Sequence, residues 1–213
     1  MYFIRILLLL CSINLLAQEK EVSAIFVGDS LTQGGSTHHT YRHFIDKCSK
    51  VKLKHTGPFK DKKNLLHAGR GGWSVQKISN HFEPWYKSSK ADLLILHANH
   101  NNFSFKKPIP AIIKAQEKII RTAHKVNPKV KVIFASSIPS VKLPKYSYLK
   151  PLAKEQFKLF ERLKKDKVNI WFANPGKGFD TNWLIKDGVH LKAQGAEHMA
   201  KCFAIIINSI YLK

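Results

Sequence analysis

The stretch AIFVGDSLTQG at residues 24–34 joins a short apolar run to a polar turn that contains a serine. Its first four residues are continuously apolar, which predicts a short buried strand. The polar segment that follows therefore places the Ser30 hydroxyl where a strand ends and a helix begins. A serine at such a junction becomes a nucleophile near neutral pH only when a base is available to take its proton.

Apolar strand signals alternate with helical signals along the rest of the chain. Strands are expected near 23–28, 51–56, 92–97, 130–135 and 168–172, and helices near 38–48, 74–86, 109–126, 149–165 and 192–210. The most apolar of the strand runs are typical of strands that are covered on both faces. The alternation predicts an α/β fold with three layers, α/β/α, around a five-stranded, mostly parallel, doubly wound sheet in the order 2-1-3-4-5.

Small or polar residues follow several of the predicted strand ends. They are Ser30, the glycine pair 71–72, the segment 99–102 and the serine pair 136–137. Ligands of doubly wound sheets bind beyond the carboxyl ends of the strands. We therefore expect these residues to line one crevice.

A second group suited to chemistry lies near the end of the sequence, at Asp187-Gly188-Val189-His190. Its carboxylate and imidazole are three residues apart, close enough on one turn to hydrogen-bond to each other. An imidazole can take a serine proton near neutral pH, and a carboxylate can fix the tautomer of that imidazole. Ser30, His190 and Asp187 are therefore the candidate catalytic residues.

Together these two motifs resemble those of the GDSL hydrolases, also called the SGNH superfamily, and they bracket most of the chain. The resemblance implies the SGNH-hydrolase fold and a serine ester hydrolase. It also implies Ser30 as nucleophile, His190 as general base and acid, and Asp187 as the residue that orients His190. The sequence contains no Gly-x-Ser-x-Gly elbow, which argues against the standard α/β-hydrolase fold.

Ester hydrolysis also requires hydrogen-bond donors for the oxyanion of the transition state. The backbone N–H of Ser30 is one candidate. The segment HAGRGGWS at residues 67–74 resembles the second block of the family, especially that of carbohydrate esterases, which implies the Gly72 N–H as the second donor. The alternative is that these glycines only form a tight turn before a helix.

The third block departs from the family pattern. Where the family has Gly-x-Asn-Asp, residues 96–102 read LHANHNN. Counting from the start of the strand aligns Asn101 with the catalytic asparagine, Asn99 with the glycine and Asn102 with the aspartate. Asn tolerates left-handed backbone better than other non-glycine residues, so Asn99 is expected to make that turn. A shorter register leaves Asn99 as the alternative oxyanion donor and places His100 at the aspartate.

Other residues near these motifs are candidates for substrate contact. Trp73 could stack on a sugar ring, although an aromatic side chain at a helix start is equally compatible with the core. The histidines at 38, 39, 43, 97 and 100 lack a convincing metal-ligand spacing, so we expect no catalytic metal and no cofactor. The substrate-binding candidates are Asp29, Arg70, Trp73, His100, Lys142 and Lys145.

The first 17 residues have the pattern of a signal peptide, with Arg5, an apolar core and Ala17 before a polar segment. We expect cleavage near Ala17 and export to the periplasm or beyond, which leaves residues 18–213 as a single hydrolase domain. The apolar run is too short and too interrupted to span a membrane, so no stable membrane insertion is expected.

The chain carries a formal net charge of +22, and removal of Arg5 with the leader leaves 22 − 1 = +21. Such an excess favours an anionic partner, and an exported protein meets anionic polysaccharide or lipid more often than nucleic acid. Lysines gather in the loops after the third, fourth and fifth strands, at positions 106, 107, 142, 145, 150, 177 and 186. We therefore expect an anionic substrate, with a generally basic surface as the alternative.

Two cysteines, Cys48 and Cys202, follow the leader, and they lack a metal-binding spacing. The predicted sheet order puts their helices on the same face of the sheet. In an oxidising compartment such a pair can form a disulfide. We expect that disulfide, with two free thiols as the alternative.

These observations favour an exported esterase that removes small acyl groups, in the first place acetyl, from carbohydrate. The segment TYRHF at 40–44, like the second block, resembles the carbohydrate-esterase branch. The runner-up within the enzyme class is a lysophospholipase or thioesterase, because the same catalytic residues serve any ester. A non-catalytic carbohydrate-binding relative with a degenerate third block is the alternative from another class.

Overall fold

The computed structural model describes residues 21–103 and 108–212, and a mostly parallel sheet lies at its centre. Strand β1 (Val22–Gly28) is followed across the sheet by β5 (Leu93–His97), β6 (Lys131–Ala135) and β7 (Ile170–Ala173). Each pair of neighbours in this series is parallel. This half of the sheet has the order expected from the sequence.

The other edge of β1 is shared end to end by two short strands. Strand β2 (Leu53–Thr56) pairs with the first half of β1, and β4 (Leu66–Gly69) pairs with its last two residues, both in parallel. The two-residue strand β3 (Phe59–Lys60) pairs antiparallel with β4. The sheet therefore has seven strands rather than the five expected, while the order 2-1-3-4-5 holds for the expected ones.

The two unexpected strands come from a segment without a strand signal. Residues 66–69 read Leu-His-Ala-Gly and include no β-branched side chain, although such side chains are the usual mark of a strand. Strand β4 forms because β1 offers it a free edge, where Gly28 lies opposite Gly69. This pairing brings the glycine-rich second block beside the turn that carries Ser30.

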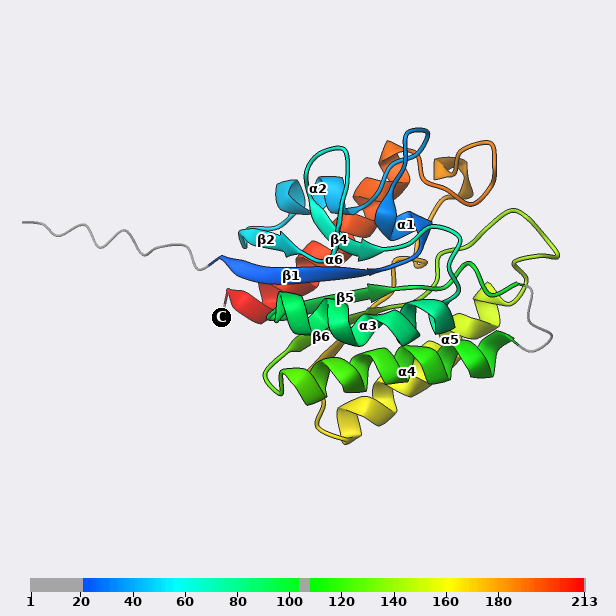
Figure 1. Ribbon diagram of the computed structural model, residues 1–213. Coiled ribbons are helices and arrows are strands. Elements are labelled where there is room, and N and C mark those ends of the chain that lie inside the picture. Colours follow the sequence, from blue (N-terminus) through cyan, green and yellow to red (C-terminus); the bar gives the residue numbers. More distant parts are fainter. Residues whose placement is uncertain (1–20, 104–107, 213) are drawn as a thin grey trace, which may run out of the picture.

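Helices cover both faces of the sheet, as Figure 1 shows. One face is covered by α3 (Val75–Ser89), α4 (Pro108–Val126) and α5 (Leu149–Lys165), and the other by α2 (Arg42–Cys48) and α6 (Ala193–Tyr211). Successive strand residues point to opposite faces, so that Ile25 belongs to the first core and Phe26 to the second. The three-layer α/β/α architecture is confirmed.

Two short helices, α1 (Ser30–Gln33) and a 3-10 helix at Thr181–Trp183, complete the secondary structure. The helix expected from residue 38 begins only at Arg42. The preceding residues are instead tied to α1, because the Thr40 hydroxyl donates to the Thr32 carbonyl at 3.0 Å and the Tyr41 hydroxyl lies 3.1 Å from the Thr32 hydroxyl. The loop before α2 thus braces the helix that starts at Ser30.

The disulfide expectation is wrong. Helices α2 and α6 pack against each other, as the sheet order predicts, but Cys48 and Cys202 are both free thiols. Packing on a shared face does not bring two particular Cβ atoms to the spacing that a disulfide needs.

The expected leader, residues 1–17, lies outside the described residues. Within 21–103 and 108–212, no helix is both long enough and apolar enough to cross a bilayer.

Candidate active site

Ser30 begins helix α1 directly after the central strand. A Cβ atom at Gly28 would lie 2.2 Å from the His97 carbonyl oxygen and 2.1 Å from the Thr32 hydroxyl oxygen, so only glycine fits there. Asp29 then caps the helix by accepting the Leu31 N–H on Oδ1 at 3.1 Å. The close packing of β1 on β5 and this cap together fix the position of the nucleophile.

Asp29 is a structural residue, which corrects its assignment as a substrate contact. Its side chain is 1% exposed, and its second oxygen accepts the backbone N–H groups of Asn99 and His100 at 3.1 and 3.0 Å. A carboxylate that accepts three backbone N–H groups in the interior is already satisfied. Asp29 therefore ties the loop after β5 to the turn that carries Ser30.

His100 is also buried and does not face substrate. Its ring is 1% exposed, with Nδ1 3.8 Å from the Asp29 carboxylate. Burial lowers the pKa of His100, and the neighbouring Asp29 only partly offsets this effect. The ring is thus neutral near pH 7 and packs beneath the site.

The structure brings Ser30, His190 and Asp187 together. The Ser30 hydroxyl lies 2.8 Å from His190 Nε2, and His190 Nδ1 lies 2.5 Å from Asp187 Oδ2. The three residues come from the two ends of the chain, 160 positions apart for Ser30 and His190. This is the geometry in which an imidazole can take a serine proton while a carboxylate fixes its tautomer.

Asp187 also holds the backbone of its own loop. Its Oδ1 accepts the N–H groups of Val189 and His190, both at 2.9 Å. Burial alone would raise the pKa of Asp187, but the hydrogen bonds from the His190 backbone and ring and from the Val189 N–H outweigh it and lower the pKa. Asp187 is therefore ionised when His190 has to accept a proton.

The loop after β6 supports this catalytic loop from the outside. The Gly188 carbonyl accepts the Ser140 hydroxyl at 2.7 Å and the Val141 N–H at 3.2 Å. Gly188 adopts φ +70°, and a Cβ there would lie 2.5 Å from a Val141 methyl group. Only glycine combines this backbone conformation with so close a neighbour.

The second block lies beside Ser30, although its glycines differ in what their N–H groups bind. A Cβ at Gly71 would lie 3.5 Å from the Ser30 Cβ, and the Gly71 N–H donates to Gln33 Oε1 at 2.5 Å. Gly72 follows with φ +73° and open space where its side chain would be. The Gly71 N–H is thus engaged, and the Gly72 N–H stays the predicted second oxyanion donor.

The two asparagines considered for the third donor have different surroundings. Asn99 is 1% exposed, and its Oδ1 accepts Gln116 Nε2 at 2.9 Å and Gln156 Nε2 at 2.7 Å. The Nδ2 atoms of both Asn99 and Asn101 have no hydrogen-bond partner among the described residues. A free donor therefore does not distinguish them. Asn99 is held in the interior by two glutamines, whereas Asn101 is half-buried. These surroundings favour Asn101 over Asn99, and the oxyanion role itself stays a prediction.

The expected left-handed turn at Asn99 is wrong. Among the described non-glycine residues, positive φ occurs at Asn64, Lys90 and Lys167. The loop needs no such turn at Asn99, because Asp29 holds its backbone N–H directly.

Asn102, at the position of the family's aspartate, joins the third block to the first turn of helix α3. Its Oδ1 accepts the Val75 N–H at 3.2 Å, and its Nδ2 donates to Gln76 Oε1 at 2.5 Å.

Arg70 and Trp73 form a cluster beside the second block. The Arg70 guanidinium lies 4.5 Å from the centre of the Phe59 ring and 5.0 Å from that of Trp73. The Lys77 ammonium lies 4.3 Å from the same indole, and Trp73 also packs against the core under α3. Cations and core side chains already contact the indole ring, which favours a structural role of Trp73 in the core over sugar stacking.

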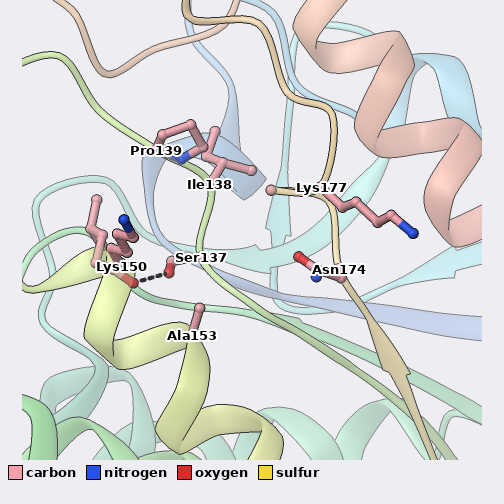
Figure 2. Close-up of a pocket in the computed structure, with 9 residues that line it drawn as sticks. Ser137, Ile138, Pro139, Lys150, Ala153, Asn174 and Lys177 are labelled. Carbon is pink, nitrogen blue, oxygen red and sulfur yellow. Dashed lines mark hydrogen bonds between the residues drawn. The ribbon is translucent and has the colours of Figure 1, made fainter.

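The lysines expected around the crevice lie in different settings. The Lys142 side chain passes beside Gly188 in the catalytic loop, whereas the Lys145 ammonium lies 3.6 Å from the centre of the Phe103 ring. Lys150 and Lys177 line a pocket of about 370 Å³ at the carboxyl ends of β6 and β7 (Figure 2). Lys106 and Lys107 lie outside the described residues.

Sequence reasoning missed a role for His38. Its ring stacks on that of His190, with the ring centres 4.1 Å apart and the planes 30° apart. Burial lowers the pKa of His38, and so does the charge of His190. The sequence places His38 next to His39, and nothing in it indicates which of the two turns toward the site.

It also missed the brace under the nucleophile. The Arg42 side chain is fully buried and donates to the Thr32 carbonyl at 2.6 Å, the Gln33 carbonyl at 3.0 Å and the Asp61 carboxylate at 2.7 Å. These carbonyls end helix α1, so Arg42 holds the far end of the helix that begins at Ser30. Within the described part of the chain, no group of three or more His, Cys, Asp or Glu side chains could hold a metal ion.

Comparison with known proteins agrees with this geometry. The model of the GDSL-like lipase/acylhydrolase family matches residues 26–198, whereas a search of the curated proteins finds no match. Among solved structures, a family 3 carbohydrate esterase from Talaromyces cellulolyticus superposes with a TM-score of 0.79 at 18% identity, over 89% of this chain and 97% of that one.

Two further structures are similar. A family 3 carbohydrate esterase from Clostridium thermocellum gives a TM-score of 0.76 at 20% identity, over 90% of this chain and 98% of that one. A carbohydrate acetylesterase from Sinorhizobium meliloti gives 0.66 at 16% identity, over 89% and 100%. At these identities the likeness establishes a shared fold.

Proposed function

Because the chain belongs to the GDSL-like lipase/acylhydrolase family and is a serine ester hydrolase, we propose that it removes small acyl groups, in the first place acetyl, from carbohydrate. The observation that carries the chemistry is the unbroken series of contacts from Ser30 Oγ through the His190 ring to the Asp187 carboxylate. The carbohydrate assignment is supported by the second block and by the fold shared with carbohydrate esterases.

The reaction follows from these contacts. His190 Nε2 takes the Ser30 hydroxyl proton as Oγ attacks the ester carbonyl, and Asp187 stabilises the imidazolium that forms. The oxyanion accepts hydrogen bonds from the backbone N–H groups of Ser30 and Gly72 and from Asn101 Nδ2. His190 then protonates the departing sugar oxygen, which leaves an acyl group on Ser30.

Water completes the cycle in a second, similar step. His190 takes a proton from the water as the water oxygen attacks the acyl carbon, and the proton then returns to Ser30 Oγ as the acid leaves. Each step moves one proton through His190. The enzyme ends in its starting protonation state.

We place this reaction outside the cytoplasm, on the basis of the leader pattern at residues 1–17. N-terminal sequencing of the protein recovered from outside the cytoplasm of its source cells is expected to begin at Gln18. Recovery of the chain from the cytoplasm with Met1 intact would contradict export.

The acyl preference separates the candidate functions. We expect the purified protein to hydrolyse p-nitrophenyl acetate and acetylated xylan, and to hydrolyse a long-chain p-nitrophenyl ester far more slowly. Faster turnover of the long-chain ester would instead support a lysophospholipase or thioesterase. Binding of xylan without turnover of either ester would indicate a non-catalytic relative.

A further inference from the structure

A series of adjacent hollows runs along the outer edge of the sheet, between helix α5 and strand β7. The first, of about 370 Å³, lies at the carboxyl ends of β6 and β7 (Figure 2). It shares Ala153 and Asn174 with a second hollow of about 440 Å³, which shares Phe157 and Phe172 with a third of about 530 Å³. We call these three hollows the α5–β7 groove.

The open edge of the sheet gives the groove its length. In the described part of the chain, β7 pairs with β6 and leaves its other edge unpaired. The groove follows β7 from Asn169 to Asn174, five residue steps or about 17 Å of extended chain, and the first hollow continues beyond. It is therefore suited to an elongated ligand rather than a compact one.

The charged side chains that line the groove are all positive. Five lysines line it and, among the described residues, no acidic side chain does; the lysines are Lys150, Lys154, Lys158, Lys164 and Lys177. The first three are four residues apart along α5, so they project from one side of the helix. Lys158 is paired with Glu155 at 2.7 Å, whereas Lys150, Lys154 and Lys177 make no ion pair with a described residue. A row of such lysines is complementary to a ligand with repeated negative charges.

Aromatic rings form the middle of the groove. Phe157 is 48% exposed and packs edge to face on Phe172, with the ring centres 5.3 Å apart. The ring centre of Phe160, a buried residue, lies 5.5 Å from that of Phe172. An exposed ring among lysines offers an apolar surface for the face of a sugar, while the ammonium groups pair with its acidic substituents.

The groove ends beside the catalytic loop. Ile138 and Pro139 wall the first hollow, and the two residues that follow them hydrogen-bond to the Gly188 carbonyl. Gly188 precedes His190 by two positions in the same turn. The first hollow therefore lies beside the loop that carries His190, and a chain lying in the groove would lead toward Ser30.

We propose that the α5–β7 groove binds a linear, polyanionic carbohydrate chain, carrying uronate or sulfate groups, and directs its acylated residues toward Ser30. This inference rests on the proposed carbohydrate esterase function and specifies its substrate class. An acidic peptide would find the same lysines and the same open strand edge, and the test below separates it from a glycan.

The first measurement is binding without turnover. In the Ser30→Ala background, calorimetric titration with polygalacturonate should show binding that weakens as salt is added, and neutral dextran should not bind. The double change Lys154→Gln with Lys177→Gln should raise Kd about five- to tenfold, the size of two exposed ion pairs. The matched change Lys125→Gln with Lys129→Gln, in the last turn of α4 and the loop that follows it, removes the same charge elsewhere and should leave Kd unchanged.

The second measurement is turnover by the protein with Ser30 intact. The groove variant should raise KM for acetylated polygalacturonate several-fold more than KM for p-nitrophenyl acetate. Equal effects of the groove and control variants on Kd would overturn the proposal that the groove binds the chain. Poly-L-glutamate binding as tightly, with the same lysine dependence, would overturn the carbohydrate assignment.

The outcomes also separate this inference from the proposed function. Hydrolysis of p-nitrophenyl acetate without binding of polygalacturonate would refute the proposed role of the groove and would leave the esterase proposal unaffected. Lysine-dependent binding of polygalacturonate without hydrolysis of any ester supports the groove and refutes the esterase.

Discussion

The Asp61 carboxylate is the acidic partner of Arg42, a guanidinium without solvent-exposed surface that holds the end of helix α1. Burial alone would raise the pKa of Asp61, but hydrogen bonds from His43 and Arg42 outweigh it and lower the pKa from its usual 3.8 to about 2. A drop of this size corresponds to about 2 kcal/mol of folding free energy near neutral pH. Loss of one partner from a buried ion pair costs about 3–5 kcal/mol, because the other charge is left unpaired.

We therefore expect Asp61→Asn to lower the free energy of unfolding by about 2–4 kcal/mol at pH 7. The folded pKa of Asp61 lies below the unfolded one, so the carboxylate contributes fully above about pH 4 and loses its contribution as the pH falls toward 2. The difference between parent and variant should accordingly shrink over that interval.

Urea denaturation followed by circular dichroism between pH 7 and pH 2.5 measures this difference. The control is Asp166→Asn, because Asp166 pairs with Arg121 at 2.6 Å but both side chains are more than 40% exposed, and such a pair contributes less than about 1 kcal/mol. An equal cost for the two variants, or a difference that does not change below pH 4, would refute the reasoning.

Three further predictions concern the catalytic groups. Asn101→Ala should lower kcat by about 10²–10³ with little change in KM, as expected for a donor used in the transition state. Asn99→Ala should instead mainly lower the melting temperature. The reverse result would move the oxyanion role to Asn99. Asp187→Asn should lower kcat less than Ser30→Ala does, since the imidazole remains, and an equal loss would contradict an orienting role. His38→Ala should lower kcat without changing the melting temperature, because His190 loses the ring stacked on it; an unchanged kcat would make His38 an incidental neighbour.

The sequence predicts the parts of this fold that depend on local patterns. Strands β5 and β6 are short, continuously apolar runs, a composition typical of strands covered on both faces, so they can be predicted without knowledge of their neighbours. Strand β4 could not be predicted in this way, because Leu-His-Ala-Gly becomes a strand only through its pairing with the end of β1. The disulfide prediction was wrong for a related reason. The topology assigns Cys48 and Cys202 to one face of the sheet but does not fix the distance between their side chains.

The sequence indicates which residues lie at the site better than it indicates what each of them does there. The motifs identify Ser30, Asp187 and His190 because their chemistry requires those side chains together. Asp29 was misassigned because its carboxylate turns inward to accept N–H groups of the loop after β5, a contact 70 residues away in sequence. The same limit applies to Arg42, whose brace with Asp61 appears only once the chain is folded.

The central claim is that Ser30 is the nucleophile and that His190 activates it. Diethyl p-nitrophenyl phosphate reacts with an activated serine hydroxyl, forming a phosphate ester on the serine and releasing p-nitrophenol. Peptide mass spectrometry of the inactivated protein should show one diethylphosphoryl group, on the peptide that contains Ser30, and Ser30→Ala should lose both the label and esterase activity. A label on another residue, or a Ser30→Ala protein that hydrolyses p-nitrophenyl acetate at the parent rate, would contradict the account.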